Sequence, residues 1–427
     1  MTSPKVAIIG AGYAGLACAV ELARHDIEVT VFERSHTLGG RARVVKKDGW
    51  TIDNGQHLLL GAYTELLRLL RLTASSPRAL HRLPLTLHVP GQLRFRAAPL
   101  PAPFHLAWGL ASARGLGLKE RWAMVRLLTR LKRAHYQVDP ATLTVDALLA
   151  AHQQPARLGA LIWKPLCLAA LNTPSAEASA QVFANILRDT FGASATASEM
   201  LIPRIDLSEL FPVPAARYLA TRQGEIRTGN AITAITRGFQ LEGDSGQTRW
   251  SHIVIATAPH HAAPLLAPLA GCAALAANIA ALPAEPITTV YLALGSGTTL
   301  AAPMTGLAST GPAQWLFDRG QSGGPAGLLA AVISARGEHE ALSHEALTQA
   351  IHAQIETQVG HSLPAPQWTQ VIHERRATFA CRPGIVRPAA STPLPGLWLA
   401  GDYVASDYPA TLESAARAGV ACARGII

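Results

Sequence analysis

Three glycines near the start of the chain, Gly10, Gly12 and Gly15, have the spacing of a loop that binds the diphosphate of a dinucleotide. They follow an apolar run at residues 6–9, which predicts a buried strand, and precede a stretch that predicts a helix at residues 16–24. Such a turn brings the backbone close to the phosphates and points the positive end of the helix dipole at them. The sequence therefore predicts a dinucleotide site where the first strand ends.

Each glycine has a separate reason to be there. Gly10 permits the tight turn, Gly12 lets a phosphate approach the backbone, and Gly15 lets the helix pack closely on the strand. Eighteen residues after Gly15, a second apolar run ends in Glu33, whose carboxylate can accept hydrogen bonds from a ribose 2′-OH. This favours an adenosine without a 2′-phosphate, and these residues alone do not distinguish NAD from FAD.

A second glycine pair follows the second predicted strand. Gly39 and Gly40 are followed by Arg41, so backbone and a guanidinium come to the same place in the sequence. Arginine suits bidentate recognition of phosphate, and we predict that Arg41 contacts the diphosphate. The alternative is an ordinary glycine turn with a surface arginine.

Cofactor chemistry returns at the far end of the chain. A predicted strand at residues 396–400 ends in Gly401 and Asp402, and a predicted helix starts shortly after Pro409. Asp402 could hold ribityl hydroxyls, and the helix N-terminus could face a flavin oxygen that becomes electron-rich on reduction. A third buried strand, at residues 253–259, ends in small residues that would let a cofactor pass close above it.

Composition limits the class of protein. The 427 residues are 49% hydrophobic and 15% charged, with a net charge of +9, which predicts a folded protein with anionic partners. No nucleic-acid motif is present, so an anionic membrane is the better expectation. The five cysteines lack metal-ligand spacing and predict a reducing compartment without a metal site. With no secretory signal or convincing membrane span, we expect a cytoplasmic protein whose membrane contact is peripheral.

Residues 119–136 predict a basic amphipathic helix. Trp122, Val125, Leu128 and Leu131 recur at a spacing of three, which predicts one apolar face. The remainder of the helix is basic, through Lys119, Arg121, Arg126, Arg130, Lys132 and Arg133. Such a helix could lie on an anionic bilayer, or it could be a lid or core helix with a solvated basic side.

Taken together, these blocks resemble the superfamily of FAD-binding amine oxidases and carotenoid desaturases. The resemblance implies an α/β protein with FAD as cofactor. Its FAD-binding domain is a discontinuous Rossmann-type unit of the glutathione-reductase-like kind, formed by residues 1–75, 203–260 and 395–427. An α+β substrate domain would comprise residues 76–202 and 261–394, including a helical lid or membrane-contact region at 106–189.

Within that superfamily, three stretches resemble the squalene-associated FAD-dependent desaturases, which are the hydroxysqualene dehydroxylases of bacterial hopanoid synthesis. The stretches are residues 53–61, residues 171–173, and residues 399–402 with 408–415. The resemblance implies reductive removal of a hydroxyl from hydroxysqualene to give squalene, beside two prenyl-synthase-like partners. A hydride would reach an allylic cation after the hydroxyl has left as water.

The resemblance also implies a set of site residues. The cofactor would be held by Gly10, Gly12, Ala14, Gly15, Glu33, Arg34, Gly39, Gly40, Arg41, Gly55, Gln56, His57, Ile232, Ala256, Gly401, Asp402, Thr411 and Leu412. We hypothesise that His57 or Asp407 protonates the leaving hydroxyl. Trp163, Phe183 and Trp315 could stabilise a cation, although each is more often a core residue.

Two other functions remain open from the sequence. One is a carotenoid desaturase or amine oxidase of the same fold, although Thr411 stands where amine oxidases often carry an aromatic residue. The other is a lipid carrier without flavin, against which the intact glycine loop and Gly401-Asp402 argue.

Overall fold

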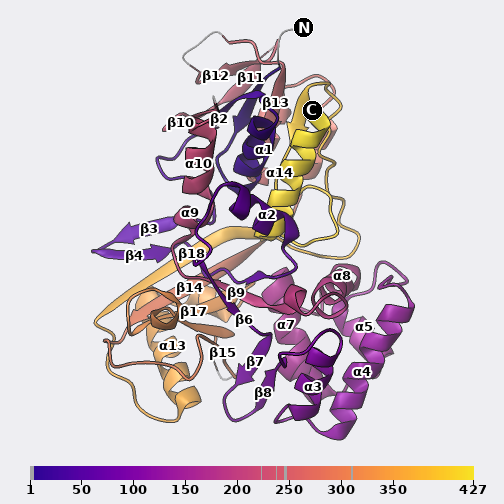
Figure 1. Cartoon of the computed structure of the whole chain (residues 1–427), viewed down its shortest axis with the longest axis vertical. Coiled ribbons are helices and arrows are strands. Elements are labelled where there is room, and N and C mark those ends of the chain that lie inside the picture. Colours follow the sequence, from indigo (N-terminus) through magenta and orange to yellow (C-terminus); the bar gives the residue numbers. More distant parts are fainter. Residues whose placement is uncertain (1–3, 223, 237, 245–247, 309–310) are drawn as a thin grey trace.

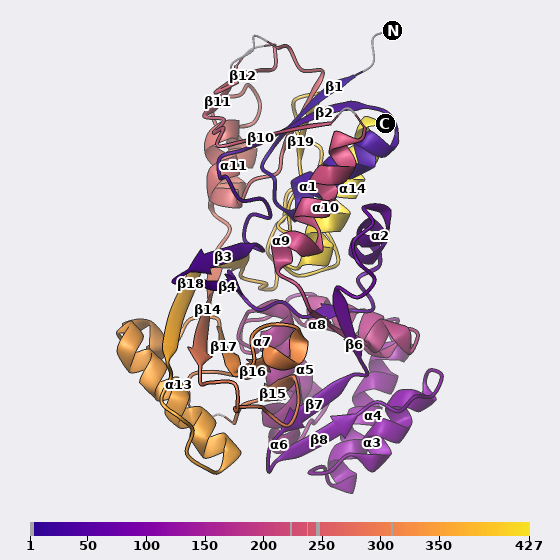
Figure 2. The ribbon, with the colours of Figure 1, turned by 60° about the vertical axis from the view of Figure 1, so that its left-hand side comes forward.

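The computed structural model describes residues 4–427 except 223, 237, 245–247 and 309–310. Three groups of elements are visible in Figure 1: a parallel sheet with its helices at the top, a second sheet with α13 at the lower left, and helices α3 to α8 at the lower right. Both chain ends lie in the upper group. Figure 2 shows the same separation after a 60° turn.

The upper group is built on a five-stranded parallel sheet of order β10-β2-β1-β13-β19. Its strands are β10 (Glu225–Thr228), β2 (Glu28–Glu33), β1 (Lys5–Ile9), β13 (His252–Ile255) and β19 (Leu397–Leu399). Residues 6–9 of the central strand are buried on both faces, as their continuous apolar run predicts. The carboxyl ends of all five strands meet at one edge, and the predicted α/β class is confirmed.

The first and last long helices of the chain pack against each other on this sheet. α1 (Tyr13–Arg24) and α14 (Leu412–Ile426) approach so closely that a Cβ at Gly419 would lie 2.1 Å from the Ala14 carbonyl oxygen. The helices α2 (Thr64–Leu72), α9 (Leu207–Leu210) and α10 (Pro212–Ala220) complete this group. The two ends of the chain therefore meet on this sheet.

The second sheet is antiparallel, in the order β15-β16-β17-β14-β18. The strands are β14 (Ala284–Ala293), β15 (Met304–Gly306), β16 (Trp315–Asp318), β17 (Leu328–Ser334) and β18 (Trp368–Phe379). Alternate residues of β14 face opposite ways: Val290 and Leu292 pack with α13 (His344–Val359), whereas Tyr291 and Ala293 pack on the other face. α13 thus covers one face of the sheet, and Tyr291 and Ala293 lie on the other.

The third group is helical, as residues 106–189 predict. It comprises α3 (Phe104–Ser112), α4 (Leu118–Arg133), α5 (Val145–Ala151), α6 (Ala156–Leu158), a π-helix (Gly159–Trp163), α7 (Lys164–Leu171) and α8 (Ala180–Phe191). Trp163 and Phe183 are fully buried and meet edge to face at 6.4 Å between ring centroids. Both are therefore core residues of this group.

Shorter strands and two further helices complete the fold. The strands are β3 (Val44–Lys47), β4 (Trp50–Asp53), β5 (Leu59–Leu60), β6 (Leu80–Leu83), β7 (Thr86–Val89), β8 (Leu93–Arg96), β9 (Met200–Pro203), β11 (Ala234–Thr236) and β12 (Gln240–Glu242); the helices are α11 (Pro259–Leu266) and α12 (Ala273–Ala280). Within the described residues, we find no helix with the length and apolar character needed to cross a bilayer.

Candidate functional site

The glycine loop between β1 and α1 forms the turn that its spacing predicts. Gly10 has φ +108°, and a Cβ there would lie 2.9 Å from the Ala256 carbonyl oxygen. A Cβ at Gly15 would lie 2.0 Å from the Gly10 carbonyl oxygen. At Gly12, by contrast, the nearest atom would be the Gly40 Cα, 4.0 Å away. Gly10 and Gly15 therefore serve the fold, whereas Gly12 leaves an open backbone surface.

The second glycine pair lies directly beside the first loop. The Gly39 amide donates to the Ala11 carbonyl oxygen at 2.9 Å, and Gly12 and Gly39 form an isolated parallel bridge. Gly40, with φ +61°, is exposed next to Gly12. We call residues 10–15 and 39–41 together the glycine cradle. At Gly12 and Gly40 it presents backbone without side chains at the edge of the sheet.

Glu33 ties the second strand to this cradle. One carboxylate oxygen accepts the Ala11 amide at 2.8 Å and the other accepts the Ser35 amide at the same distance. The side chain is buried, yet each oxygen keeps a second lone pair. Glu33 is thus fixed in place with acceptor capacity left for a ribose hydroxyl.

Arg41 and Asp402 lie side by side, although 361 residues separate them in sequence. The Arg41 guanidinium donates to the Asp402 carboxylate at 2.7 Å and to the Ala377 carbonyl oxygen at 2.6 Å. Burial opposes the charge of Arg41, but Asp402 outweighs it and raises the pKa of Arg41. The structure therefore brings two predicted cofactor residues together as an ion pair at the site.

The loop after β19 is organised by a residue that the sequence analysis missed. Arg387 donates to the backbone carbonyl oxygens of Asp402 (2.7 Å), Val404 (2.5 Å) and Tyr408 (2.6 Å), and also to those of Tyr403 and Ser406. Because all of these acceptors are backbone atoms, they leave no signature in the sequence. Arg387 thus positions the segment that leads to α14.

That segment ends at a capped helix. Thr411 is the N-cap of α14, where its hydroxyl accepts the Ser414 amide at 3.1 Å, and Leu412 is the first helical residue. Glu413 is fully buried, and its carboxylate accepts the Glu65 and Leu66 amides at the start of α2. The start of α14 is therefore held by its own N-cap and by the contact of Glu413 with α2.

A chain of hydrogen bonds positions the segment after β4. Gln56 donates to the Tyr291 hydroxyl at 2.7 Å, and that hydroxyl donates to the Asp53 carbonyl oxygen at 2.8 Å. The Asp53 carboxylate accepts the Leu207 amide at 2.8 Å, and burial raises its pKa to about 6. Tyr291, which belongs to the second sheet, thereby fixes Gly55 and Gln56 at the junction of the two sheets.

The two predicted proton donors differ in environment. His57 is half-buried, and burial together with the nearby Arg41 charge lowers its pKa to about 4. The side chain of Asp407 is 72% exposed and faces the Arg188 guanidinium at 3.8 Å. The structure thus places His57 beside the cradle residue Arg41 and Asp407 at the surface, so Asp407 is a poor donor for a buried substrate.

The remaining predicted residues lie around the edge of the sheet. Ala14 is buried in the first turn of α1, and Ala256 directly follows β13. Arg34 is exposed, with a guanidinium nitrogen 3.1 Å from His261 Nε2. Ile232 is half-buried between β10 and β11. None of these four side chains is a buried polar group.

The cradle region fits a dinucleotide cofactor. The Thr257 and Tyr403 hydroxyls are buried without a hydrogen-bond partner among the described residues. Thr257 lies beside Gly10, and the Tyr403 ring lies against Gly401. Buried hydroxyls are normally hydrogen-bonded, so these two hydroxyls, one beside Gly10 and one beside Gly401, are consistent with a ligand that supplies the missing partners.

A profile of the flavin containing amine oxidoreductase family matches residues 13–427. The chain belongs to this family. It is an FAD-dependent oxidoreductase.

Two full-length relatives refine the placement within the family. The chain is 30% identical to hydroxysqualene dehydroxylase of Rhodopseudomonas palustris, over 98% of this chain and 97% of that protein. It is 27% identical to hydroxysqualene dehydroxylase of Sinorhizobium fredii, over 97% of both chains. An oxidoreductase structure from Methanosarcina mazei covers 99% of this chain and 100% of its own, with a TM-score of 0.77 at 17% identity, and shows the same fold.

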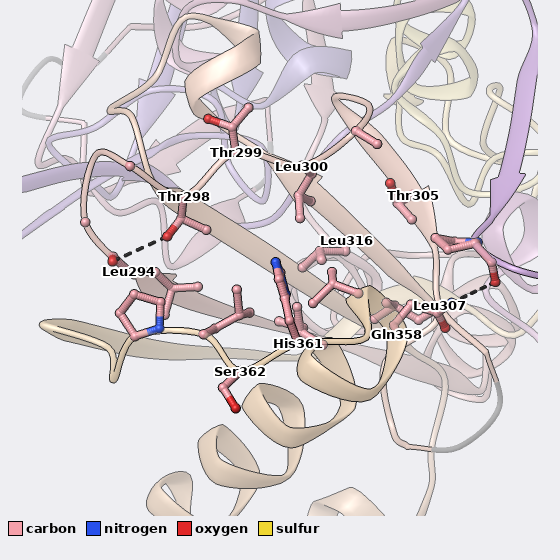
Figure 3. Close-up of a pocket in the computed structure, with 18 of the residues that line it drawn as sticks. Leu294, Thr298, Thr299, Leu300, Thr305, Leu307, Leu316, Gln358, His361 and Ser362 are labelled. Carbon is pink, nitrogen blue, oxygen red and sulfur yellow. Dashed lines mark hydrogen bonds between the residues drawn. The ribbon is translucent and has the colours of Figure 1, made fainter.

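A cavity of about 690 Å³ lies beside the second sheet (Figure 3). Leu294, Leu307, Leu316 and His361 line it, between the end of α13 and the edge of the second sheet. Leu294 and Leu316 belong to the sheet face that packs on α13, whereas Tyr291 lies on the opposite face. The sheet therefore separates this cavity from the segment that Tyr291 positions.

Proposed function

We propose that this chain removes the hydroxyl of hydroxysqualene reductively and releases squalene and water. The observation that carries the proposal is the 30% identity to a hydroxysqualene dehydroxylase over nearly the whole of both chains. The C–O bond breaks, the hydroxyl leaves as water with one proton, and a hydride forms the new C–H bond. The substrate thus gains two electrons and two hydrogens and loses one water.

The cofactor would be held from both ends of the chain. The glycine cradle and the N-terminus of α1 would hold the diphosphate, and Glu33 the adenosine ribose. Arg41 and Asp402 would lie along the diphosphate and ribityl chain, and Gly55, Gln56 and the N-cap Thr411 beside the ring. When bound and reduced, FAD supplies the hydride for this chemistry.

His57 is the residue that we propose as the proton donor. Its pKa of about 4 means that the imidazole is uncharged at neutral pH, so it could hold the substrate hydroxyl by a hydrogen bond. Its protonated form, although a small fraction, is a strong acid for the departing hydroxyl. Tyr291 and Gln56 would keep the segment that carries His57 in place.

The rival oxidative functions have less support. Thr411 is the N-cap of α14. This position therefore lacks the aromatic side chain that amine oxidases often carry there. The glycine cradle and the family membership both argue against a lipid carrier without flavin.

The deciding experiment is a single turnover with photoreduced holoenzyme under anaerobic conditions. Hydroxysqualene should reoxidise the flavin in a 1:1 ratio with squalene formed, whereas a polyene or an amine should leave the flavin reduced. Flavin that stays reduced with hydroxysqualene would reject the proposal. Matched His57→Ala and Asp407→Asn variants then test the proton donor, and we expect a slower turnover in the first alone.

The wider setting follows from the same chemistry. We propose that the chain acts in bacterial squalene and hopanoid synthesis, after prenyl-synthase-like enzymes that deliver the triterpene alcohol. A water-insoluble substrate would favour work at the cytoplasmic face of a membrane. Co-purification of the chain with those enzymes, with a His57→Ala variant as the control for activity-independent association, would test the partnership.

A further inference from the structure

Exposed apolar side chains concentrate at one end of the molecule. Of the nine large hydrophobic residues that are exposed in the described part of the chain, six lie within residues 100–125. They are Leu100, Phe104, Trp108, Leu118, Trp122 and Val125, which we call the α3–α4 face. Trp108 is 62% and Trp122 is 70% exposed, unusual values for the largest apolar side chain. Both views place α3 and α4 together at the lower right (Figures 1 and 2).

Buried side chains and hydrogen bonds fix the orientation of α3 and α4. α3 buries His105 and Gly109, and α4 buries Ala123, Met124 and Leu127. The Arg121 guanidinium donates to the carbonyl oxygens of Ala111 and Ala113, both at 2.6 Å, and so joins the start of α4 to the end of α3. The exposed side chains therefore belong to a fixed surface rather than to a loose segment.

This arrangement corrects the expected apolar stripe of the basic helix. Trp122 and Val125 are exposed, but Leu128 is half-buried and Leu131 lies in the core. Each step of three residues falls about 60° short of a full helical turn, so Leu131 ends up opposite Trp122. The exposed stripe instead follows Leu118, Trp122 and Val125.

Basic side chains lie beside that stripe, and almost no acidic side chains are close by in sequence to neutralise them. Residues 94–133 contain nine Lys and Arg residues and one acidic residue, Glu120, in a chain whose net charge is +9. Glu120 is already bound to Arg157 at 2.9 Å and to the Gly117 amide at 2.7 Å. Lys119 and Arg133 lie about 60–100° around the helix from Leu118, so they border the apolar stripe.

We propose that the α3–α4 face inserts into the interfacial layer of an anionic phospholipid bilayer. The tryptophans would lie at headgroup depth with their apolar rings inward, and the flanking cations would contact phosphate groups. The charge pattern selects this occupant, because a second copy of the chain would bring the same cations to the interface. The proposal does not depend on the reaction proposed above.

The test is sedimentation of holoenzyme with unilamellar vesicles of phosphatidylcholine, with and without 30 mol% phosphatidylglycerol. We expect strong binding to the anionic vesicles, weaker binding to neutral ones, and release by added salt. A Trp108→Ser/Trp122→Ser variant should bind at least about tenfold more weakly. The matched control, Leu342→Ser/Val386→Ser, removes two exposed apolar side chains elsewhere and should bind like the wild type.

A second variant tests the charges. Lys119→Glu/Arg133→Glu should weaken binding to anionic vesicles by more than about tenfold and remove most of its salt dependence. Each variant should keep full flavin content and wild-type turnover on detergent-dispersed substrate, which separates this test from that of the reaction. Equal binding by the tryptophan variant and its control would overturn the proposal. So would a wild-type dimer that the tryptophan substitutions convert to monomer, because the face would then bind a second copy.

Discussion

The glycine cradle and the α3–α4 face are opposite ways of building a binding surface. In the cradle, glycines expose backbone, and nearby charges such as Glu33, Arg41 and Asp402 are already held by protein partners. On the α3–α4 face, large side chains and cations project outward from helices fixed from behind. The contrast teaches that a specific ligand requires preorganised polar groups, whereas a lipid surface requires apolar area and charge.

The largest effects are expected at two glycines of the cradle, one needed for stability and the other for FAD binding. Gly15→Ala should lower the free energy of unfolding by about 3 kcal/mol, because its Cβ would collide with the Gly10 carbonyl oxygen. Gly12→Ala should leave the stability of the deflavinated protein unchanged but weaken FAD binding about tenfold or more, because its Cβ faces the open cradle. Thermal unfolding and bound flavin per chain measure the two effects.

The control for this pair is Gly297→Ala, at an exposed glycine where a Cβ would meet nothing within 4 Å. It should change neither quantity. If Gly12→Ala destabilised the deflavinated protein as much as Gly15→Ala, the distinction between a folding glycine and a ligand glycine would fail.

Substitution of Arg387 tests how far the loop after β19, at residues 402–408, is preorganised. Arg387→Ala should cost about 3 kcal/mol of unfolding free energy, because it leaves several backbone carbonyl oxygens without their donor. Arg387→Lys should rescue little, since one ammonium cannot reach five acceptors. Chemical denaturation measures the effect, and Arg375→Ala, at an exposed arginine, is the control. Rescue by lysine would show that charge, and not geometry, is what the loop needs.

The pH dependence of the reaction tests whether His57 is the proton donor. If its imidazolium delivers the proton, the rate of flavin reoxidation by hydroxysqualene should rise about tenfold for each pH unit lowered from 7 to 5. The sign follows from its pKa of about 4, because the protonated fraction grows as the pH falls toward that value. The His57→Ala variant should be slower and lose this slope. A wild-type profile that is flat over this range would exclude His57 as the donor.

The smallest expected effect concerns the ion pair of the cradle. Asp402→Asn keeps an acceptor oxygen but removes the charge opposite Arg41, and should weaken FAD binding by about threefold to tenfold. Equilibrium titration of deflavinated protein with FAD measures this, and Asp139→Asn, at an exposed position, is the control. An unchanged affinity would mean that the pair holds the two ends of the chain together without serving the flavin.

The fold was predictable from sequence where glycine geometry leaves few options. The strand, the three glycines, the helix and Glu33 predicted the first βαβ unit, because a turn of this kind tolerates no Cβ at Gly10 or Gly15. The pairing of Arg41 with Asp402 was not predictable. Each residue was expected at the cofactor separately, and nothing in their local sequence shows that one faces the other.

Other contacts of the site could not be predicted from the sequence for a related reason. Arg387 acts on backbone carbonyl oxygens, and Tyr291 reaches the segment after β4 from another sheet. Neither kind of contact requires a particular side chain at the partner position, so no motif marks it. The exposed stripe of α4 was partly predicted, but a spacing of three does not match the helical repeat and placed Leu131 on the wrong face.

The joining of α1 and α14 has a consequence for how the protein is made. The first strand and helix leave the ribosome long before β13, β19 and α14. The central strand β1 therefore has only β2 beside it until its second partner, β13, is made far later in the sequence. Pairings of such long sequence separation form slowly, and an unfinished sheet edge invites aggregation. We expect nascent chains arrested before β19 to need chaperone protection, and to release it as the last helix emerges.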